Sequence, residues 1–318
     1  MSNGRSAKES GEARHYSFAQ LDVFTARPLE GNALAVFTDA RGLSDTEMQA
    51  VARETHLSET TFVFPREPTV ERGHGVRVRI FTREEELPFA GHPTLGTAFA
   101  LRGLDRGAAG GGTVRARSGA AKIVLDLEAG RIPVEFSAEG GGQVFGEMHQ
   151  LDPKMGERHS REEIARVAGL AVADIATDLP IQTVSTGLAF AIVPLVSRKA
   201  IEKLALDWKR VAEYTERTDA KFLYFVTRET VDWEARMHAR MIFYNGEDPA
   251  TGAAAGCAAA WMTAHGVARP DEQVLIEQGL EVRRPSRILV RAGKSGDHVV
   301  NVRVGGHAVE VMRGELLL

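Results

Sequence analysis

The sequence predicts an α+β protein that is built as two similar halves. Three observations support this prediction: short strand-like runs occur along the whole chain, a helix-start signal occurs in each half, and one short motif occurs twice. The chain has 318 residues, which at ~150 residues per domain is enough for two domains. We therefore expect two separate hydrophobic cores of similar design.

The composition is that of a globular protein without a nucleic-acid or membrane partner. Hydrophobic residues make up 43% and charged residues 26%, close to the average for folded chains. The 39 basic and 43 acidic residues nearly balance, and no basic block could follow a phosphate backbone. No run approaches the ~18 apolar residues that span a bilayer. Cys257 has no second cysteine to pair with, which favours a cytoplasmic location.

The first half is predicted to combine several strands with a helix. Residues 1–15 are polar and contain no apolar run, and we expect them to be a mobile tail. Residues 18–24 and 33–37 form two apolar runs around a turn, and Ser44 with Glu47 gives the capping box of a helix. Further strand-like runs cover residues 61–64, 76–82, 123–127 and 132–136.

The second half follows a similar order. Ser160 and Glu163 give the same capping signature before an apolar helical pattern. The glycines at 140–142 interrupt the chain and predict a boundary between a first domain, residues 16–142, and a second domain, residues 143–318. Packing of the final strand on the first domain, instead of the second, stays open as an alternative. Strand-like runs of this half cover residues 190–196, 222–227, 240–244, 288–291, 299–304 and 308–312.

An internal repeat gives the most specific structural signal. Residues 92–98 and 248–254 both fit [His/Asp]-Pro-x-x-Gly-x-Ala, and 248 − 92 = 156 residues separate them. Proline is favoured at the first helical position, so each copy predicts a helix start, with His92 and Asp248 as the capping residues. The glycine of each copy weakens a helix, which indicates close approach of another backbone or a ligand.

Two such helix N-termini, brought together by the symmetry of the halves, would present free backbone N–H groups to one cleft. The positive ends of the two helix dipoles would favour an anion there by roughly 0.3–1 kcal/mol each. The expected ligand is a small carboxylate, and the same groups would stabilise an enolate. Two ordinary structural helices with conventional caps remain the alternative at this point.

Five motifs, in this order along the chain from about Tyr16 to its end, carry a family resemblance. The motifs are DVFT at 22–25 with GN at 31–32, LSETTF at 57–62, FAGHPT at 89–94, EDPATG at 247–252 and RPS at 284–286. As a set they are specific, and they resemble the phenazine-biosynthesis isomerase family, the PhzF-like proteins, which have the diaminopimelate-epimerase fold.

The resemblance implies two pseudo-symmetric domains, each a β-barrel-like sheet around a central helix, with the active site between the helix N-termini. It implies an isomerase of the trans-2,3-dihydro-3-hydroxyanthranilate isomerase type, which moves a proton on a carboxylate-bearing, cyclic or conjugated substrate without metal or organic cofactor. Glu59 corresponds to the catalytic acid/base, and His92 and Asp248 to its substrate-holding and proton-relaying partners. A homodimer follows from the same resemblance.

Residue chemistry is compatible with these roles but does not single them out. Without the resemblance, Glu59 reads as an exposed surface residue; in the site, partial burial would raise the pKa of its carboxyl toward that of a proton shuttle. Backbone groups at Gly91, Gly252 and Ala253 are expected to bind the substrate carboxylate. Asn32 is expected to contact the substrate, and a role in a turn fits it equally well.

One departure from the family pattern concerns the substrate. The family usually has Gly-Ser-Ala where this chain has Gly252-Ala253-Ala254, so one neutral hydrogen bond of about 0.5–1.5 kcal/mol is lost. A non-catalytic sensor of small acids and a racemase or epimerase with bases other than thiols stay open as alternatives. An epimerase with two catalytic thiols would need a second cysteine. The histidines show no metal-ligand spacing, and no metal site is predicted.

Overall fold

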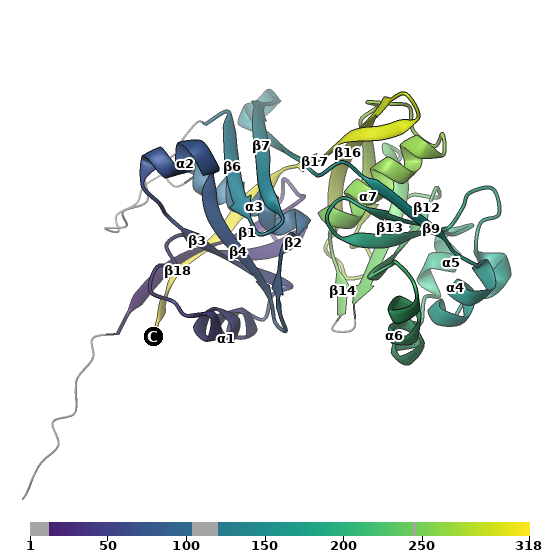
Figure 1. Ribbon diagram of the computed structural model, residues 1–318, viewed down its shortest axis with the longest axis horizontal. Coiled ribbons are helices and arrows are strands. Elements are labelled where there is room, and N and C mark those ends of the chain that lie inside the picture. Colours follow the sequence, from purple (N-terminus) through teal and green to yellow (C-terminus); the bar gives the residue numbers. More distant parts are fainter. Residues whose placement is uncertain (1–12, 104–119, 244–245) are drawn as a thin grey trace, which may run out of the picture.

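Two lobes lie side by side, each built of strands around one buried helix (Figure 1). The computed structural model describes residues 13–103, 120–243 and 246–318. Both lobes contain strands and helices, as the predicted α+β class requires. Within the described ranges no helix combines the length and the hydropathy needed to cross a bilayer.

The first lobe contains helix α3 at its centre and α1 and α2 on its outside (Figure 1). Its helices are α1 (Asp45–Thr55), α2 (Pro68–His74), α3 (Gly91–Gly103) and the 3-10 turn η1 (Gly140–Gly142). Its strands are β1 (His15–Val23), β2 (Asn32–Phe37), β3 (Glu59–Phe64), β4 (Val76–Thr82), β5 (Glu86–Leu87), β6 (Lys122–Leu127), β7 (Gly130–Ala138), β8 (Val144–His149) and β18 (Ala308–Leu317).

The second lobe contains helix α7 at its centre and α4, α5 and α6 on its outside (Figure 1). Its helices are α4 (Arg161–Ala168), η2 (Val172–Asp174), α5 (Arg198–Glu202), α6 (Trp208–Arg217) and α7 (Gly252–Ala264). Its strands are β9 (Lys154–Arg158), β10 (Gln182–Ser185), β11 (Ala189–Pro194), β12 (Phe222–Thr227), β13 (Ala235–Phe243), β14 (Gly246–Asp248), β15 (Val274–Gln278), β16 (Ser286–Ser295) and β17 (His298–Gly306).

The two lobes have the same pattern of strand pairing. In the first lobe β1–β2 is antiparallel, β2–β3 parallel, β3–β4 antiparallel, β4–β6 parallel, and β6–β7 and β7–β8 antiparallel. The second lobe repeats this series with β10–β11, β11–β12, β12–β13, β13–β15, β15–β16 and β16–β17. The halves are therefore pseudo-symmetric.

The chain crosses between the lobes in both directions. After β8 it enters the second lobe, where β9 pairs with β10. After β17 it returns to the first lobe, where β18 pairs with β1 through nine residue pairs. Strands β8 and β17 pair with each other and join the two sheets into one. The first lobe therefore takes its last strand, β18, from the C-terminal end of the chain.

The main hydrophobic core is continuous across the lobes. It includes Leu34 and Leu95 of the first lobe together with Trp261 and Ile276 of the second. The prediction of two separate cores is wrong, because α3 and α7 pack against each other between the sheets. Two smaller clusters lie elsewhere, one beneath α1 and one beneath α4, α5 and α6.

Both central helices are buried on nearly every side, which suits their small, apolar sequences. They begin at Gly91 and Gly252 and have 13 residues each, so the structural repeat is 252 − 91 = 161 residues. The same offset relates two buried or half-buried ion pairs that precede the helices. Arg79 donates to Glu86 at 2.7 Å, and Arg240 donates to Glu247 at 2.9 Å. The sequence repeat of 156 residues is therefore five residues shorter than the structural repeat of 161 residues, so the two motifs do not occupy equivalent positions.

The predicted capping role of Asp248 is wrong. Thr251 is the N-cap of α7, and Asp248 ends β14. The side chain of Gln278 explains the difference, because it donates to the carbonyl oxygen of Asp248 at 2.7 Å and accepts from the amide of Thr251 at 3.2 Å. These bonds hold the intervening residues outside the helix. His92 and Pro93 lie inside the first turn of α3, which begins one residue before His92.

The helix starts at Ser44 and Ser160 are confirmed, since both side chains cap their helices. The described part of the chain also contains α2, α5 and α6, which the sequence pattern does not predict. Residues 1–12 of the predicted tail and residue 244 of a predicted strand lie outside the described residues. His15 begins β1, and the backbone of Arg14 pairs with that of Leu318.

Candidate active site

The N-terminal turns of α3 and α7 are in direct contact. A Cβ atom on Gly91 would come within 2.6 Å of the Cα of Gly252, and a Cβ on Gly252 would come within 2.8 Å of the Phe24 ring. Only glycine permits this approach of two backbones. At Gly96, where close backbone approach was also predicted, the neighbours are instead the side chains of Leu34 and Val23.

A cavity of about 260 Å³ lies beside this contact and is lined by both lobes. Glu59 enters it from the first residue of β3, His92 from the first turn of α3, and Asp248 from the last residue of β14. The sequence places these three residues far apart, and the fold brings them together. One nitrogen or oxygen atom of each lies within 4.8 Å of those of the other two.

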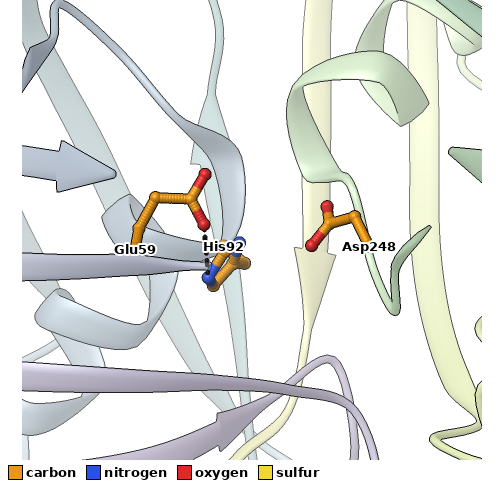
Figure 2. A group of neighbouring side chains, drawn as sticks. All are labelled: Glu59, His92 and Asp248. Atoms are coloured by element: carbon orange, nitrogen blue, oxygen red, sulfur yellow. Dashed lines mark ion pairs between the residues drawn. The ribbon is translucent and has the colours of Figure 1, made fainter. Parts of the chain in front are cut away.

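Glu59 and His92 face Asp248 across the cavity (Figure 2). The Nε2 atom of His92 lies 3.4 Å from Oε2 of Glu59. Both atoms are buried, and neither has a hydrogen-bond partner among the residues that the structure describes. Buried polar atoms without partners are costly in a folded protein, so their place in a cavity indicates that a ligand satisfies them.

Burial changes the acid–base properties of all three residues. Only 12% of the Glu59 side chain is exposed, and desolvation together with the nearby Asp248 carboxylate raises its pKa well above the ordinary value. Burial raises the pKa of Asp248 to about 6, even though hydrogen bonds to its carboxylate oppose the shift. Burial lowers the pKa of His92 to about 3, so its imidazole is neutral near pH 7. The cavity therefore contains two acids that hold protons more tightly than usual.

Asn32 links the two sides of the site. Its Nδ2 atom donates to Oδ1 of Asp248 at 2.6 Å and to the carbonyl oxygen of Ala250 at 3.0 Å, and it lies 3.1 Å from Nδ1 of His92. Thr251 donates to the other carboxylate oxygen of Asp248 at 2.6 Å. Asn32 is thus hydrogen-bonded within the protein through the nitrogen of its amide.

Gln278 supports the Asp248 side of the site, and sequence reasoning missed it. Besides its bonds to Asp248 and Thr251, it accepts a hydrogen bond from the Tyr224 hydroxyl at 2.9 Å. Gln278 ends the fully buried strand β15. The sequence does contain a signal for this role, because Gln278 is a polar residue at the end of an apolar strand. A buried amide requires hydrogen-bond partners, so such a residue is expected to bind neighbouring polar groups.

Arg284 supports the Asn32 side in a similar way. It donates to Oδ1 of the buried Asp22 and to the carbonyl oxygen of Gly31, both at 2.7 Å. These bonds fix the loop that leads into Asn32. Arg284 belongs to the RPS motif at 284–286, and its part in holding this loop was not predicted from the sequence.

The walls of the cavity differ because equivalent positions carry different side chains. In the first lobe Phe62 pairs with Arg79, and in the second Phe225 pairs with Arg240, so β3 and β12 are equivalent strands. Three residues before these phenylalanines stand Glu59 and Phe222. The second lobe therefore presents a phenyl ring where the first presents an acid.

The same comparison holds at the helix starts. With the helices aligned on their first residues, Ala253 of α7 corresponds to His92 of α3. Leu188, Phe190 and Phe243 complete an apolar wall on the side of the second lobe. Sequence reasoning missed this wall, since aromatic residues at strand ends are ordinary core residues in isolation.

The helix starts supply polar backbone groups to the cavity. Gly91, His92, Gly252 and Ala253 all line it, and their N–H groups lie in first helical turns, which have no helical partners. Two helix dipoles point their positive ends at the same space. Among the described residues, Glu59, His92 and Asp248 are also the group whose atoms lie close enough to share a metal ion.

Comparisons with known proteins find one family along most of the chain. A family model described as "Phenazine biosynthesis-like protein" matches residues 21–314. An uncharacterized isomerase of Mesorhizobium japonicum is 38% identical over 313 residues, covering 95% of this chain and 99% of the relative. The trans-2,3-dihydro-3-hydroxyanthranilate isomerase of Pseudomonas chlororaphis is 34% identical over 304 residues, covering 95% of this chain and 100% of the relative.

Solved structures show the same fold. A phenazine biosynthesis protein of the PhzF family from Bacillus anthracis matches with a TM-score of 0.82 and 28% identity, covering 96% of this chain and all of that one. A hydroxyproline epimerase from Agrobacterium vitis matches with a TM-score of 0.64 and 11% identity, covering 97% and 93% of the two chains. At that identity the likeness concerns the fold alone, which is the predicted diaminopimelate-epimerase-like fold.

Proposed function

Since the chain belongs to the phenazine biosynthesis-like, or PhzF, family and is an isomerase of that family, we propose that it moves a proton on a small unsaturated ring acid, with Glu59 as the acid/base. The observation that carries this proposal is the Glu59 carboxyl, which is buried and has an unpartnered oxygen at the cavity between the helix N-termini. A proton-transfer group works best when its pKa is close to the working pH. The raised pKa of Glu59 moves it in that direction.

The polar and apolar walls suit a planar acid. The N–H groups at Gly91, His92, Gly252 and Ala253 are placed to bind a carboxylate, and Phe222 offers an apolar face to a ring. A cavity of about 260 Å³ is large enough for one ring. The Pseudomonas relatives are named for trans-2,3-dihydro-3-hydroxyanthranilate, a ring acid of this kind.

The proposed reaction has two proton transfers. Glu59 in its ionised form takes a proton from a ring carbon, and the electron pair of the broken C–H bond enters the conjugated system and its carboxylate. The backbone N–H groups stabilise the negative charge that develops there. Protonated Glu59 then gives the proton to a different carbon of the same system. Substrate and product contain the same atoms, and Glu59 returns to its starting state.

A Glu59→Gln variant tests this proposal. We expect turnover of trans-2,3-dihydro-3-hydroxyanthranilate to fall by about 10²- to 10⁴-fold, because glutamine keeps the shape but cannot carry the proton. Conversion is followed by proton NMR, and circular dichroism checks the fold. The matched control is Glu54→Gln, at an exposed position of α1, which should keep full activity. Equal rates for wild type and Glu59→Gln would refute the mechanism.

Epimerisation is a second candidate, because two carboxylates from opposite lobes face the cavity. In that case Asp248 would be the second base. Its two oxygens already accept hydrogen bonds from Asn32 and Thr251, which makes it the weaker base of the pair. Loss of the Cα proton signal of trans-4-hydroxy-L-proline in D₂O would favour epimerisation. Binding of ring acids without any change in them would favour a sensor.

A further inference from the structure

We infer that Asn32 is a positioning residue that fixes the imidazole proton of His92 on Nε2, so that His92 faces the substrate as a neutral hydrogen-bond donor. The inference rests on the proposed function for its catalytic consequence, while its structural part concerns the ligand-free protein. It assigns Asn32 a protein-internal role in place of the expected substrate contact.

The orientation of the Asn32 amide follows from its neighbours. The atom that faces Asp248 and Ala250 meets a carboxylate oxygen at 2.6 Å and a carbonyl oxygen at 3.0 Å. The Ala250 carbonyl only accepts hydrogen bonds, and so does the Asp248 carboxylate in its ionised form. The amide nitrogen must therefore face them, because the amide oxygen would be repelled by both. Asn32 is itself 2% exposed, which leaves water little access to replace these bonds.

The orientation of Asn32 determines the tautomer of His92. The same amide nitrogen lies 3.1 Å from Nδ1 of His92. Its two N–H groups face three acceptor atoms, so one N–H is shared, and the nitrogen cannot accept a hydrogen bond from Nδ1. Nδ1 must therefore carry a lone pair instead of a proton. A neutral imidazole has one N–H, so the proton is on Nε2. The buried surroundings of His92 keep the ring neutral, which agrees with its lowered pKa.

The Nε2–H group points to the reacting part of the cavity. It lies 3.4 Å from Oε2 of Glu59 and has no hydrogen-bond partner among the described residues. In this state His92 cannot accept a proton from the substrate, and it can donate to a substrate oxygen or to ionised Glu59. The two residues therefore have different roles. Glu59 moves the proton, and the Nε2–H of His92 stabilises the negative charge that develops on a neighbouring substrate oxygen.

The first experiment measures the tautomer directly in the wild-type protein. Histidine labelled with ¹⁵N gives distinct signals for protonated and unprotonated ring nitrogens, and a His92→Gln variant assigns the His92 signals among the ten histidines. We expect a protonated Nε2 and an unprotonated Nδ1 near pH 7. A proton on Nδ1 would overturn the inference, whether or not the protein turns over any ring acid.

The second experiment reverses the donor. In Asn32→Asp the atom next to Nδ1 of His92 becomes a carboxyl oxygen. The two neighbouring carboxyls of Asp248 and the new aspartate share one proton, and a lone pair of the new oxygen faces Nδ1. We expect the His92 proton to move to Nδ1 and kcat to fall by about 10- to 100-fold, as for the loss of one donor to a developing charge. An unchanged tautomer in a folded Asn32→Asp variant would contradict the inference.

The matched control is Thr251→Val. It removes another hydrogen bond to Asp248, at 2.6 Å, and makes no contact with His92 that the structure records. We expect its His92 signals to match those of wild type. A changed tautomer in this variant would show that Asp248, and not Asn32, controls the ring. If Asn32→Asp does not fold, the ¹⁵N measurement on the wild-type protein still tests the His92 tautomer. Failure of the proposed reaction would appear differently, as absent turnover in a wild-type protein whose His92 proton is on Nε2.

Discussion

Glu59, His92 and Asp248 derive their properties from their surroundings more than from their side-chain type. In water two of them would be ionised acids near pH 7 and the third would titrate near pH 6.5. In the cavity burial shifts all three toward their neutral forms. Both carboxyls therefore bind a proton more tightly than exposed acids do, while the imidazole binds one less tightly.

The coupling between the two acids predicts a shift in the pH dependence of activity. The Asp248 charge contributes to the raised pKa of Glu59, so removing it in Asp248→Asn should lower that pKa. Activity requires ionised Glu59, and the acidic limb of the kcat/KM profile should move to lower pH, with a reduced plateau. A limb that stays in place or moves to higher pH would contradict the coupling.

The same burial predicts that Glu59 destabilises the fold at high pH. A carboxyl with a raised pKa in the folded state contributes stability that is complete below its ordinary value near 4.5 and is lost as pH rises through the folded value. Glu59→Gln should therefore melt at a higher temperature than wild type at pH 8, and the difference should vanish at pH 4. Thermal unfolding at the two pH values measures this, with Glu54→Gln as the surface control.

At the scale of elements, the contact between the starts of α3 and α7 positions the site. Glycine is required there by a contact between residues 161 positions apart, 252 − 91, which no local pattern reveals. The sequence did reveal that two helix starts matter and which residues surround them. It placed the helix start at Pro249 because local propensity favours proline there, whereas the long-range bonds of Gln278 delay the helix to Gly252.

A Gly91→Ala substitution tests this contact. The added methyl group would come within 2.6 Å of the Gly252 backbone, which cannot rotate away. We expect a loss of about 1–3 kcal/mol in unfolding free energy, with a larger loss in kcat/KM, because the amides of both helix starts move. The control is Gly103→Ala at the other end of α3, where a Cβ meets nothing within 4 Å. Equal effects of the two substitutions would show that the contact is unimportant.

At the scale of the whole molecule, the two lobes share one core, one sheet and one cavity. The sequence predicted the pseudo-symmetry, because the strand-like runs and the helix signals recur in both halves. It could not predict the shared core, since that depends on how the central helices meet. The asymmetry of the cavity was also hidden, because it appears only when β3 and β12 are aligned by their strand pairing.

The shared core predicts that the lobes unfold together. All three tryptophans, Trp208, Trp233 and Trp261, lie in the second lobe, so their fluorescence reports that lobe alone. Circular dichroism reports both lobes. Urea unfolding followed by the two signals should give the same midpoint. Two separated midpoints would show that the lobes are independent units despite their common core.

The pairing of β1 with β18 has a consequence for how the protein is made. His15 lies opposite Leu317, so one edge of β1 remains uncovered on the ribosome until almost all of the chain has been synthesised. An open strand edge invites pairing with other nascent chains. Newly translated copies should therefore need protection from one another until β18 emerges and closes the first lobe.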